Sequence, residues 1–411
     1  MNRLSLPSAI LLLAACGGTR GTATSGVDTL GTDRHATTSN PTMIAKADPA
    51  AAFRKTWSNP GGMWLPQQMT LAQHVELFNK LGVTLDAKSL ADPLADPLGA
   101  VVSLGNCTAS FVSPDGLIVT NHHCVQDALQ LNSTPDSDLV KAGFLAKTRA
   151  DEKSAGPAKR VMVAQAFRDV THAMRDGLDE IADPVARKLE SEKRSKALIA
   201  ACEKDRPEVR CQVADMFRGG SYTLIEMLEI KDVRVVYVPA RSIGNFGGEV
   251  DNWHWPRHTG DFSFLRAYVG KDGKPAEFSA DNVPFHPKRY LRVSTEGVAA
   301  GDFVMVMGYP GSTNRTVTAS TLHHDLEWYY PYYIAYAEEH YRLYEAHLHD
   351  AGETGIKAGV AKQGTQNGLE KFRGILDGLN RDPELLARKD ALEKKVQAWA
   401  AAPGHLSLIH I

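Results

Sequence analysis

The 411-residue chain lacks a strong charge imbalance, because its formal net charge is −2 and its Lys and Arg residues form no basic block. It therefore gives no global reason to expect nucleic acid or an anionic membrane surface as a partner. It also lacks an internal repeat and any Cys-x-x-Cys spacing, which leaves little support for a zinc site. A hydrophobic content of 43% and a charged content of 23% are ordinary for a soluble globular protein, long enough for two or three domains.

Long hydrophobic runs are also lacking, apart from SLPSAILLLAA at residues 5–15, which is too short for a permanent membrane span. A cationic start precedes this run, and small residues lead into Cys16, a pattern that resembles the bacterial lipobox. We expect a lipoprotein signal peptide over 1–15, acylation of Cys16 and a flexible Gly/Thr/Ser-rich tether over 16–50. An ordinary secretory signal is the alternative. Either interpretation exports the chain to the periplasm or the outer membrane.

Export changes the interpretation of the remaining cysteines. Cys107, Cys124, Cys202 and Cys211 form an even set, which in an oxidising compartment predicts two disulfides. Cys107 and Cys124 flank a predicted hairpin and can face each other. Cys202 and Cys211 would close a small loop.

The hydrophobic pattern predicts a mixed β and α protein. FVSPDGLIVTN at 111–121 predicts a hairpin, because Pro114 presets the turn and Gly116 accepts a positive φ. A helical excursion is expected over about 160–228, where charged and apolar residues mix, and helices are expected again from 319 onward. Further strands are predicted by apolar, β-branched runs at 233–240, 262–270, 289–294 and 302–310.

Two motifs indicate the chemistry of a serine peptidase. TNHHC ends the predicted hairpin, and DNWHWPRHTGDFSF at 251–264 places Asp261 at the start of a strand. A histidine takes the hydroxyl proton in such an enzyme, and a buried carboxylate fixes the tautomer of that histidine. Of the two histidines, His123 is favoured because chymotrypsin-like folds place the base directly before this cysteine. The alternatives are a structural His-His-Cys segment and an Asp261 that only caps a turn.

The same segment holds two histidines four residues apart, His254 and His258, which raises the question of a metal. Pro256 lies between them and prevents the helix that would align them, so we expect no metal there. Trp253 and Trp255 are either plain core aromatics or part of a binding site.

Four segments carry a resemblance to a known family: GMWLPQQM at 62–69, FVSPDGLIVTNHHC at 111–124, GNFGGEVDNWHWPRHTGDFSFLRAY at 244–268 and MGYPGSTNR at 307–315. In their length and order they resemble the bacterial dipeptidyl-peptidase serine family, the group that includes dipeptidyl peptidases seven and eleven. They extend over most of the chain between 61 and 315.

The resemblance implies a chymotrypsin-like double β-barrel with an inserted α-helical domain. The chain would hold the first barrel and part of the second at 51–318, with the start of the helical domain at 319–404. The last residues, 405–411, fit nothing before them, and we interpret them as a non-native tail; a short natural tail is the alternative.

The resemblance also implies site residues and substrates. His123 matches the general base and Asp261 the orienting carboxylate of an enzyme that releases dipeptides from peptides with free N-termini. Asn252 and Trp253 match the pair that holds the substrate's amine, and Asn367 is expected as a further contact. Asn252 offers an amide oxygen, and Trp253 a ring that can face an ammonium group. No cofactor is implied, a homodimer is left open, and the membrane is reached only through the lipid anchor.

The chain departs from the family pattern in two places. The family nucleophile lies in a GNSGSP-like segment that this sequence lacks, and Ser312 sits in a different motif, so we expect a fragment that is inactive alone. Glu249 stands where the family has Asp, which keeps the charge. The alternatives are a trypsin-like periplasmic endopeptidase and a non-catalytic peptide-binding lipoprotein.

Overall fold

The structure is a computed structural model, which describes residues 48–59, 63–134, 136–217, 219–310, 317–350 and 353–402. The predicted signal peptide, Cys16, nearly all of the predicted tether, Ser312 and the tail at 405–411 lie outside these residues.

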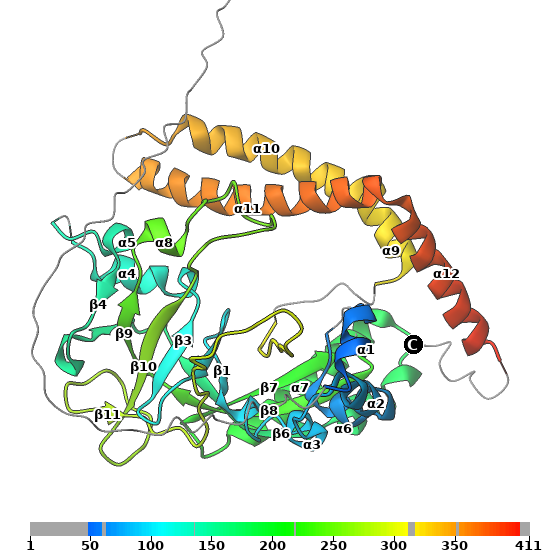
Figure 1. The fold of residues 1–411 in the computed structure, drawn as a ribbon, viewed down its shortest axis with the longest axis horizontal. Helices are drawn as coiled ribbons and strands as arrows, with labels where there is room; N and C mark the ends of the chain where they lie inside the picture. Colours follow the sequence, from blue (N-terminus) through cyan, green and yellow to red (C-terminus); the bar gives the residue numbers. More distant parts are fainter. Residues whose placement is uncertain are drawn as a thin grey trace, which may run out of the picture. The chain divides into compact units, whose positions relative to one another are not determined.

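The β part of the described residues is one sheet of eleven strands, all paired antiparallel (Figure 1). Its order is β4-β9-β10-β3-β2-β1-β6-β8-β7, with β11 paired to β10 and β5 paired to β9. The strands are β1 (Val101–Ser103), β2 (Thr108–Phe111), β3 (Leu117–Thr120), β4 (Phe144–Leu145), β5 (Lys153–Ser154), β6 (Val161–Asp169), β7 (Val209–Met216), β8 (Ser221–Ile230), β9 (Asp232–Val238), β10 (Ser263–Val269) and β11 (Val283–Pro284).

The hairpin between β2 and β3 forms as the sequence predicts. The Ser113 hydroxyl accepts hydrogen bonds from the backbone N–H groups of Asp115 and Leu117, which closes the turn. Gly116 has a φ of 68°, and a Cβ there would lie 2.7 Å from the carbonyl oxygen of Phe285. Only glycine fits this position, because both the dihedral angle and the close backbone exclude a side chain.

The hydrophobic core lies behind this hairpin. Alternate residues of β2 and β3 are buried, including Phe111 and Ile118, and they pack with Leu265 of β10. Val125 and Leu129 cover the same core from η3 (His123–Val125) and α4 (Gln126–Asn132). The residues at the end of β3 are therefore held between a sheet and a helix.

Helices follow the sheet in the chain. Tyr333 of α10 packs on Phe372 of α11 with ring centroids 4.5 Å apart, so α10 and α11 form a pair (Figure 1). Asp382 caps α12, because its side chain accepts a hydrogen bond from the N–H of Leu385. These helices are α9 (Ala319–His324), a π-helical segment η6 (Asp325–Tyr329), α10 (Tyr330–Ala346), α11 (Glu353–Arg381) and α12 (Pro383–Ala400).

The other helices are α1 (Ala51–Thr56), η1 (Pro66–Thr70), α2 (Ala72–Leu81), α3 (Ala87–Ala91), η2 (Leu98–Ala100), α5 (Leu139–Ala142), η4 (Arg149–Asp151), α6 (Thr171–Arg175), η5 (Leu178–Glu180), α7 (Pro184–Glu203) and α8 (Arg241–Gly244). Within the described part of the chain, no helix has both the length and the apolar character that a bilayer span requires.

The helical excursion predicted over about 160–228 is wrong at both ends. Only α6, η5 and α7 are helical, whereas β6 precedes them and β7 and β8 follow. The strands show the alternation that the charged residues concealed: Val161 and Val163 of β6 are buried, as are Val209 and Cys211 of β7. The predicted disulfide between Cys202 and Cys211 is confirmed and joins α7 to β7.

The strands predicted at 289–294 and 302–310 are also not formed. Val293, Val304 and Val306 are 77%, 70% and 100% exposed, although their side chains are apolar. A strand needs a partner for its backbone, and this stretch has one isolated ladder-like bond, from the N–H of Leu291 to the carbonyl of Phe111. Strand-forming composition without a pairing edge leaves these residues irregular.

Candidate active site

The pairing of β3 with β10 places His123 beside Asp261. Thr120, the last residue of β3, is the register partner of Ser263, the first residue of β10. Because the strands are antiparallel, the residues that follow β3 meet the residues that precede β10. His123 and Asp261 are 138 positions apart in the chain, yet the sheet register alone brings them to the same edge.

The two side chains form a hydrogen-bonded pair, called here the His–Asp pair. Nδ1 of His123 lies 2.8 Å from Oδ2 of Asp261. The other carboxylate oxygen accepts the backbone N–H of His123 at 3.1 Å, and the Asn121 side chain donates to the carboxylate as well. An ionised carboxylate only accepts, so the proton of a neutral imidazole lies on Nδ1, and Nε2 remains the nitrogen that can take a proton.

Each member of the His–Asp pair shifts the other's ionisation. The hydrogen bond to Asp261 raises the pKa of His123 above its ordinary value. Burial by itself raises the pKa of the Asp261 carboxyl, but the hydrogen bonds from the His123 side chain and backbone outweigh it, so this pKa lies below its ordinary value. The ion pair formed when His123 is protonated is therefore favoured.

The preceding histidine has a different environment. His122 is 1% exposed, whereas the side chain of His123 is 63% exposed. The backbone of His122 is helical, with φ −58° and ψ −46°, so strand alternation does not set this difference. Burial lowers the pKa of His122, so its imidazole is neutral. Gly244 of α8 packs on this ring so closely that a Cβ would lie 2.2 Å from Cδ2.

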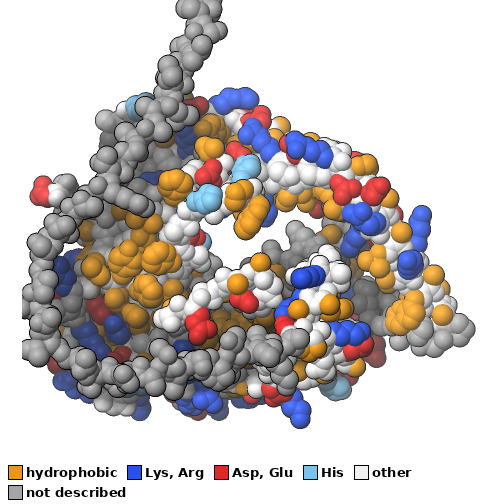
Figure 2. All heavy atoms as spheres, viewed as in Figure 1, with side chains coloured by type: hydrophobic (Ala, Val, Ile, Leu, Met, Phe, Trp, Pro, Cys, Tyr) orange, Lys and Arg blue, Asp and Glu red, His pale blue; other side chains and the backbone are white. Residues whose placement is uncertain are grey.

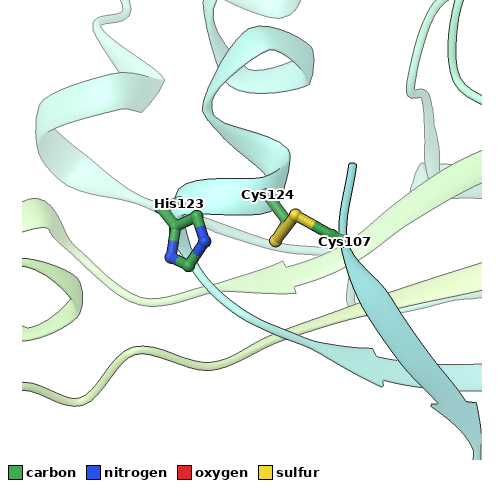
Figure 3. A group of neighbouring side chains, drawn as sticks. All are labelled: Cys107, His123 and Cys124. Atoms are coloured by element: carbon green, nitrogen blue, oxygen red, sulfur yellow. A yellow bond between two sulfur atoms is a disulfide. The ribbon is translucent and has the colours of Figure 1, made fainter. Parts of the chain in front are cut away.

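The predicted disulfide between Cys107 and Cys124 is confirmed, and it links the start of β2 to η3 next to His123 (Figure 3). The three residues are the one group among the described residues whose side chains lie close enough to hold a metal ion. A cysteine in a disulfide has no thiolate to offer, so this group holds the histidine loop rather than a metal.

The connection between β9 and β10 runs to α11 (Figure 1), and the residues expected from the resemblance meet there. The Asn252 side chain donates to Oδ1 of Asn367 at 2.7 Å, and the Trp253 indole N–H donates to the same oxygen at 2.9 Å. The sequence predicts these three residues in one site, although Asn367 lies 115 positions from Asn252.

Two further residues complete this polar cluster, which consists of Glu249, Asn252, Trp253, Gln363 and Asn367. Glu249 accepts from the Asn252 side chain at 2.8 Å and from Gln363 at 3.4 Å. Sequence reasoning gave Glu249 no contact and missed Gln363. The spacing of Gln363 and Asn367 on one helix face was the available signal.

The backbone and the surroundings of Trp253 are unusual. Trp253 has a φ of 62°, which a bulky side chain rarely adopts. Trp253 is 57% and Trp255 93% exposed, so the alternative of plain core aromatics is wrong. Histidine and hydrophobic side chains lie side by side where the β9–β10 connection approaches α11 (Figure 2).

Arg257 contacts Asn252 rather than Asp261. Its guanidinium donates to Oδ1 of Asn252 at 2.7 Å and to the hydroxyl of Thr259 at 2.9 Å. The amide oxygen that the sequence offers to a substrate amine is therefore already bound by a cation.

The chain is similar in sequence to known dipeptidyl-peptidases. The chain is 41% identical over 338 residues to an Asp/Glu-specific dipeptidyl-peptidase of Shewanella putrefaciens, covering 82% of this chain and 45% of the relative. It is 34% identical over 350 residues to a dipeptidyl-peptidase 7 of Capnocytophaga gingivalis, covering 83% of this chain and 48% of the relative. The chain thus spans about half the length of the curated relatives it matches.

The fold is similar to solved structures of a related protein. Porphyromonas endodontalis DPP11 in complex with substrate matches with a TM-score of 0.74 and 34% identity, over 84% of this chain and 50% of that chain. The same protein in an alternate conformation matches with a TM-score of 0.61 and 33% identity, over 80% of this chain and 51% of that chain. The family model Peptidase S46 matches residues 59–408, and the chain belongs to the peptidase S46 family.

Proposed function

We propose that this chain is the N-terminal part of a serine-type dipeptidyl aminopeptidase, which releases dipeptides from the free N-termini of oligopeptides. The observation that carries the proposal is the 2.8 Å contact between Nδ1 of His123 and Asp261. Membership of the S46 family and the dipeptidyl-peptidase names of its relatives support it.

In this proposal His123 is the general base. Asp261 holds the proton of His123 on Nδ1, so that Nε2 takes the proton of a serine hydroxyl and later gives it to the leaving amine. The serine and the backbone N–H groups that stabilise the oxyanion would come from sequence outside this chain. The sheet would then be the first barrel of a chymotrypsin-like pair, and the exposed apolar stretch at 289–310 would pair with the second.

The polar cluster would hold the other end of the substrate. An aminopeptidase that removes two residues at a time needs a closed end at which the substrate's ammonium group is bound. Asn252, Trp253 and Asn367 meet at one place, reached by the same β9–β10 connection that ends at Asp261. The distance between amine site and His123 would then set the length of the product.

Export and assembly form a further part of the proposal. Acylation at Cys16 would anchor the protein to a bacterial membrane, in the periplasm or at the outer membrane. A homodimer is left open. Labelling with a radioactive fatty acid tests the anchor, because Cys16→Ser removes the label. Light scattering during size-exclusion chromatography measures the molar mass and therefore the oligomeric state.

The test of the function uses a chimera in which residues 59–402 of this chain replace the matching part of the Shewanella putrefaciens relative. We expect the chimera to release dipeptides from a fluorogenic dipeptidyl substrate, and the 411-residue chain alone to release none. Acetylating the substrate's N-terminus abolishes hydrolysis by an aminopeptidase and spares hydrolysis by an endopeptidase. A chimera that folds, binds peptides and never hydrolyses them supports the peptide-binding alternative instead.

A further inference from the structure

Asn121, the first residue after β3, contacts Asp261 twice. Its side-chain NH₂ group donates to Oδ2 of Asp261 at 3.1 Å and to the backbone carbonyl oxygen of Asp261 at 3.2 Å. An amide NH₂ group has two protons, and these two bonds account for both. Exchanging the oxygen and nitrogen of the amide would set a carbonyl oxygen against two acceptors. The orientation of the Asn121 amide is therefore fixed.

Asn121 is not needed to hold the Asp261 carboxylate in place. The register of β3 with β10 brings Asp261 to His123, and two bonds from His123 then hold the carboxylate. The backbone N–H of His123 donates to Oδ1 at 3.1 Å, and Nδ1 lies 2.8 Å from Oδ2. Both oxygens keep a donor when the Asn121 side chain is removed, so its main contribution to the His–Asp pair is electrostatic.

Oδ2 of Asp261 is shared by two donors, the Asn121 amide and the ring N–H of His123. The positive end of the amide dipole points at the oxygen that stabilises the protonated imidazole. A donor on an ionised oxygen offsets part of the negative charge that this oxygen presents to its other donor. The amide therefore weakens the stabilisation that Asp261 gives to protonated His123.

The charged groups that face His123 act independently of Asn121. The charge of Arg257 opposes protonation of His123, and the neighbouring His122 is buried and neutral. Among the described residues, Asn121 is the one side chain other than His123 that bonds the Asp261 carboxylate. Substitution of Asn121 by a neutral residue thus changes this carboxylate without changing any charge.

We propose that Asn121 adjusts the strength of the His–Asp pair: by donating to Oδ2 of Asp261, it limits how strongly this carboxylate stabilises the protonated imidazole of His123. A base whose protonated form is stabilised too strongly stays protonated near neutral pH and cannot take the proton of a serine. Asn121 acts on His123 through Asp261 and touches no reacting atom, so it is not itself a catalytic residue. The proposal rests on the proposed function, in which His123 is the general base.

The first test is an NMR titration of the His123 imidazole in the 411-residue chain, which contains all three residues and needs no nucleophile. We expect Asn121→Ala to raise the pKa of His123 by about 0.5, the effect of losing one partly exposed hydrogen bond to the carboxylate. The ring signals are assigned with His123→Gln. Asn79→Ala, which replaces an exposed asparagine of α2, is the matched control and leaves the titration unchanged.

A second background separates the electrostatic effect from a structural one. Asn121→Ala is repeated in the chain that carries Asp261→Asn, where position 261 has no carboxylate charge to offset. We expect Asn121→Ala to change the pKa of His123 by less than about 0.2 in this background, because the two residues act through one contact. A role in folding alone would give the same change in both backgrounds.

The chimera tests the consequence for catalysis. The acid limb of its kcat/KM profile reports the ionisation of the base in the free enzyme. We expect Asn121→Ala to move this limb to higher pH by about 0.5, in agreement with the NMR titration. An equal loss of activity at every pH, with the limb unmoved, would show a structural role and overturn the proposal.

The outcomes distinguish this inference from the proposed function. A pKa of His123 that stays the same or falls in Asn121→Ala overturns the inference, as does an equal rise in the Asp261→Asn background. Either result leaves the proposed function standing, because that function depends on hydrolysis by the chimera. A folded chimera that hydrolyses no dipeptidyl substrate contradicts the proposed function, whereas the NMR titrations still decide whether Asn121 acts on the His–Asp pair.

Discussion

The His–Asp pair and the polar cluster are built in different ways, although one connection between β9 and β10 contributes to both. The His–Asp pair is set by backbone register, because Thr120 faces Ser263 across two adjacent strands. The polar cluster is set by side chains, which join that connection to α11 through bonds such as Asn252 to Asn367.

This difference determines how each of the two sites responds to substitution. A pair positioned by a ladder of backbone bonds moves only if the sheet moves, so single side chains near it have little influence on its geometry. A cluster positioned by side-chain hydrogen bonds depends on each partner, and loss of one leaves others unsatisfied. We therefore expect substitutions in the polar cluster to alter binding while leaving the His–Asp pair intact. We expect substitutions in the His–Asp pair to leave the polar cluster intact.

The largest effect is expected from removing the base. His123→Ala in the chimera lowers kcat by about 10⁴-fold or more, because no other group takes the serine proton. Its side chain is 63% exposed, so the folded state is little affected. Rates of hydrolysis of the fluorogenic dipeptidyl substrate give kcat for each variant. His172→Ala, which replaces an exposed histidine of α6, is the control. Activity that survives His123→Ala at near-normal level contradicts the assignment.

A smaller effect is expected from the packing beneath the His–Asp pair. Gly244→Ala destabilises the chain by about 1–3 kcal/mol, because the added methyl group overlaps the buried ring of His122. Urea unfolding followed by circular dichroism measures the change. Gly364→Ala, in α11 with open space around it, is the matched control and is neutral or stabilises by up to about 1 kcal/mol. Equal effects of both substitutions would show that His122 does not support this region.

The polar cluster is tested by Asn367→Ala. This substitution removes the shared acceptor of Asn252 and Trp253, and we expect roughly tenfold weaker binding of Ala-Ala-amide, a probe with a free ammonium group. The NMR signal of the Trp253 indole N–H follows the binding. Asn380→Ala lies on the same helix about 20 Å further along and leaves binding unchanged. The titration of His123 stays the same in both variants if the two sites are as separate as proposed.

The smallest effect concerns stability as a function of pH. The pKa of His123 is raised, so the protonated His123 adds to the free energy of unfolding. This contribution is complete below the ordinary pKa of 6.5 and is lost as pH rises through the raised value. The pKa of Asp261 is lowered, so its contribution is present above 3.8 and is lost as pH falls through the lowered value. Asp261→Asn therefore destabilises most between about pH 4 and 6.5, by less than about 1 kcal/mol because the pair is partly exposed. If the free energies of unfolding of Asp261→Asn and the unsubstituted chain differed by the same amount at every pH, this prediction would be contradicted.

Local signals in the sequence predicted the elements whose stabilising contacts come from residues close together in the chain. The β2–β3 hairpin needs only Ser113, Pro114 and Gly116 in the right order, and the fold confirms it. Both disulfides also follow from cysteine number and spacing in an exported chain. The contact between His123 and Asp261 was predicted by resemblance, and the register of β3 with β10 supplies its physical reason.

Elements that depend on distant partners could not be predicted in the same way. Val161 and Val163 alternate as a strand requires, but the charged residues around them favour a helix when only the local sequence is considered. The pairing of β6 with β8 stabilises the strand. The stretch at 302–310 has strand composition without a paired edge. The spacing of Gln363 and Asn367 places them on one helix face, but it does not predict that α11 lies over the β9–β10 connection, and this contact brings Gln363 into the polar cluster.

The most direct test of the His–Asp pair is an NMR titration of the His123 imidazole in the 411-residue chain. We expect the pKa of His123 to lie above 6.5 and to fall when Asp261 is replaced by Asn, because the hydrogen-bonded carboxylate stabilises the protonated ring. A His123 that titrates at or below its ordinary value, and does not respond to Asp261→Asn, would show that the pair does not exist in solution.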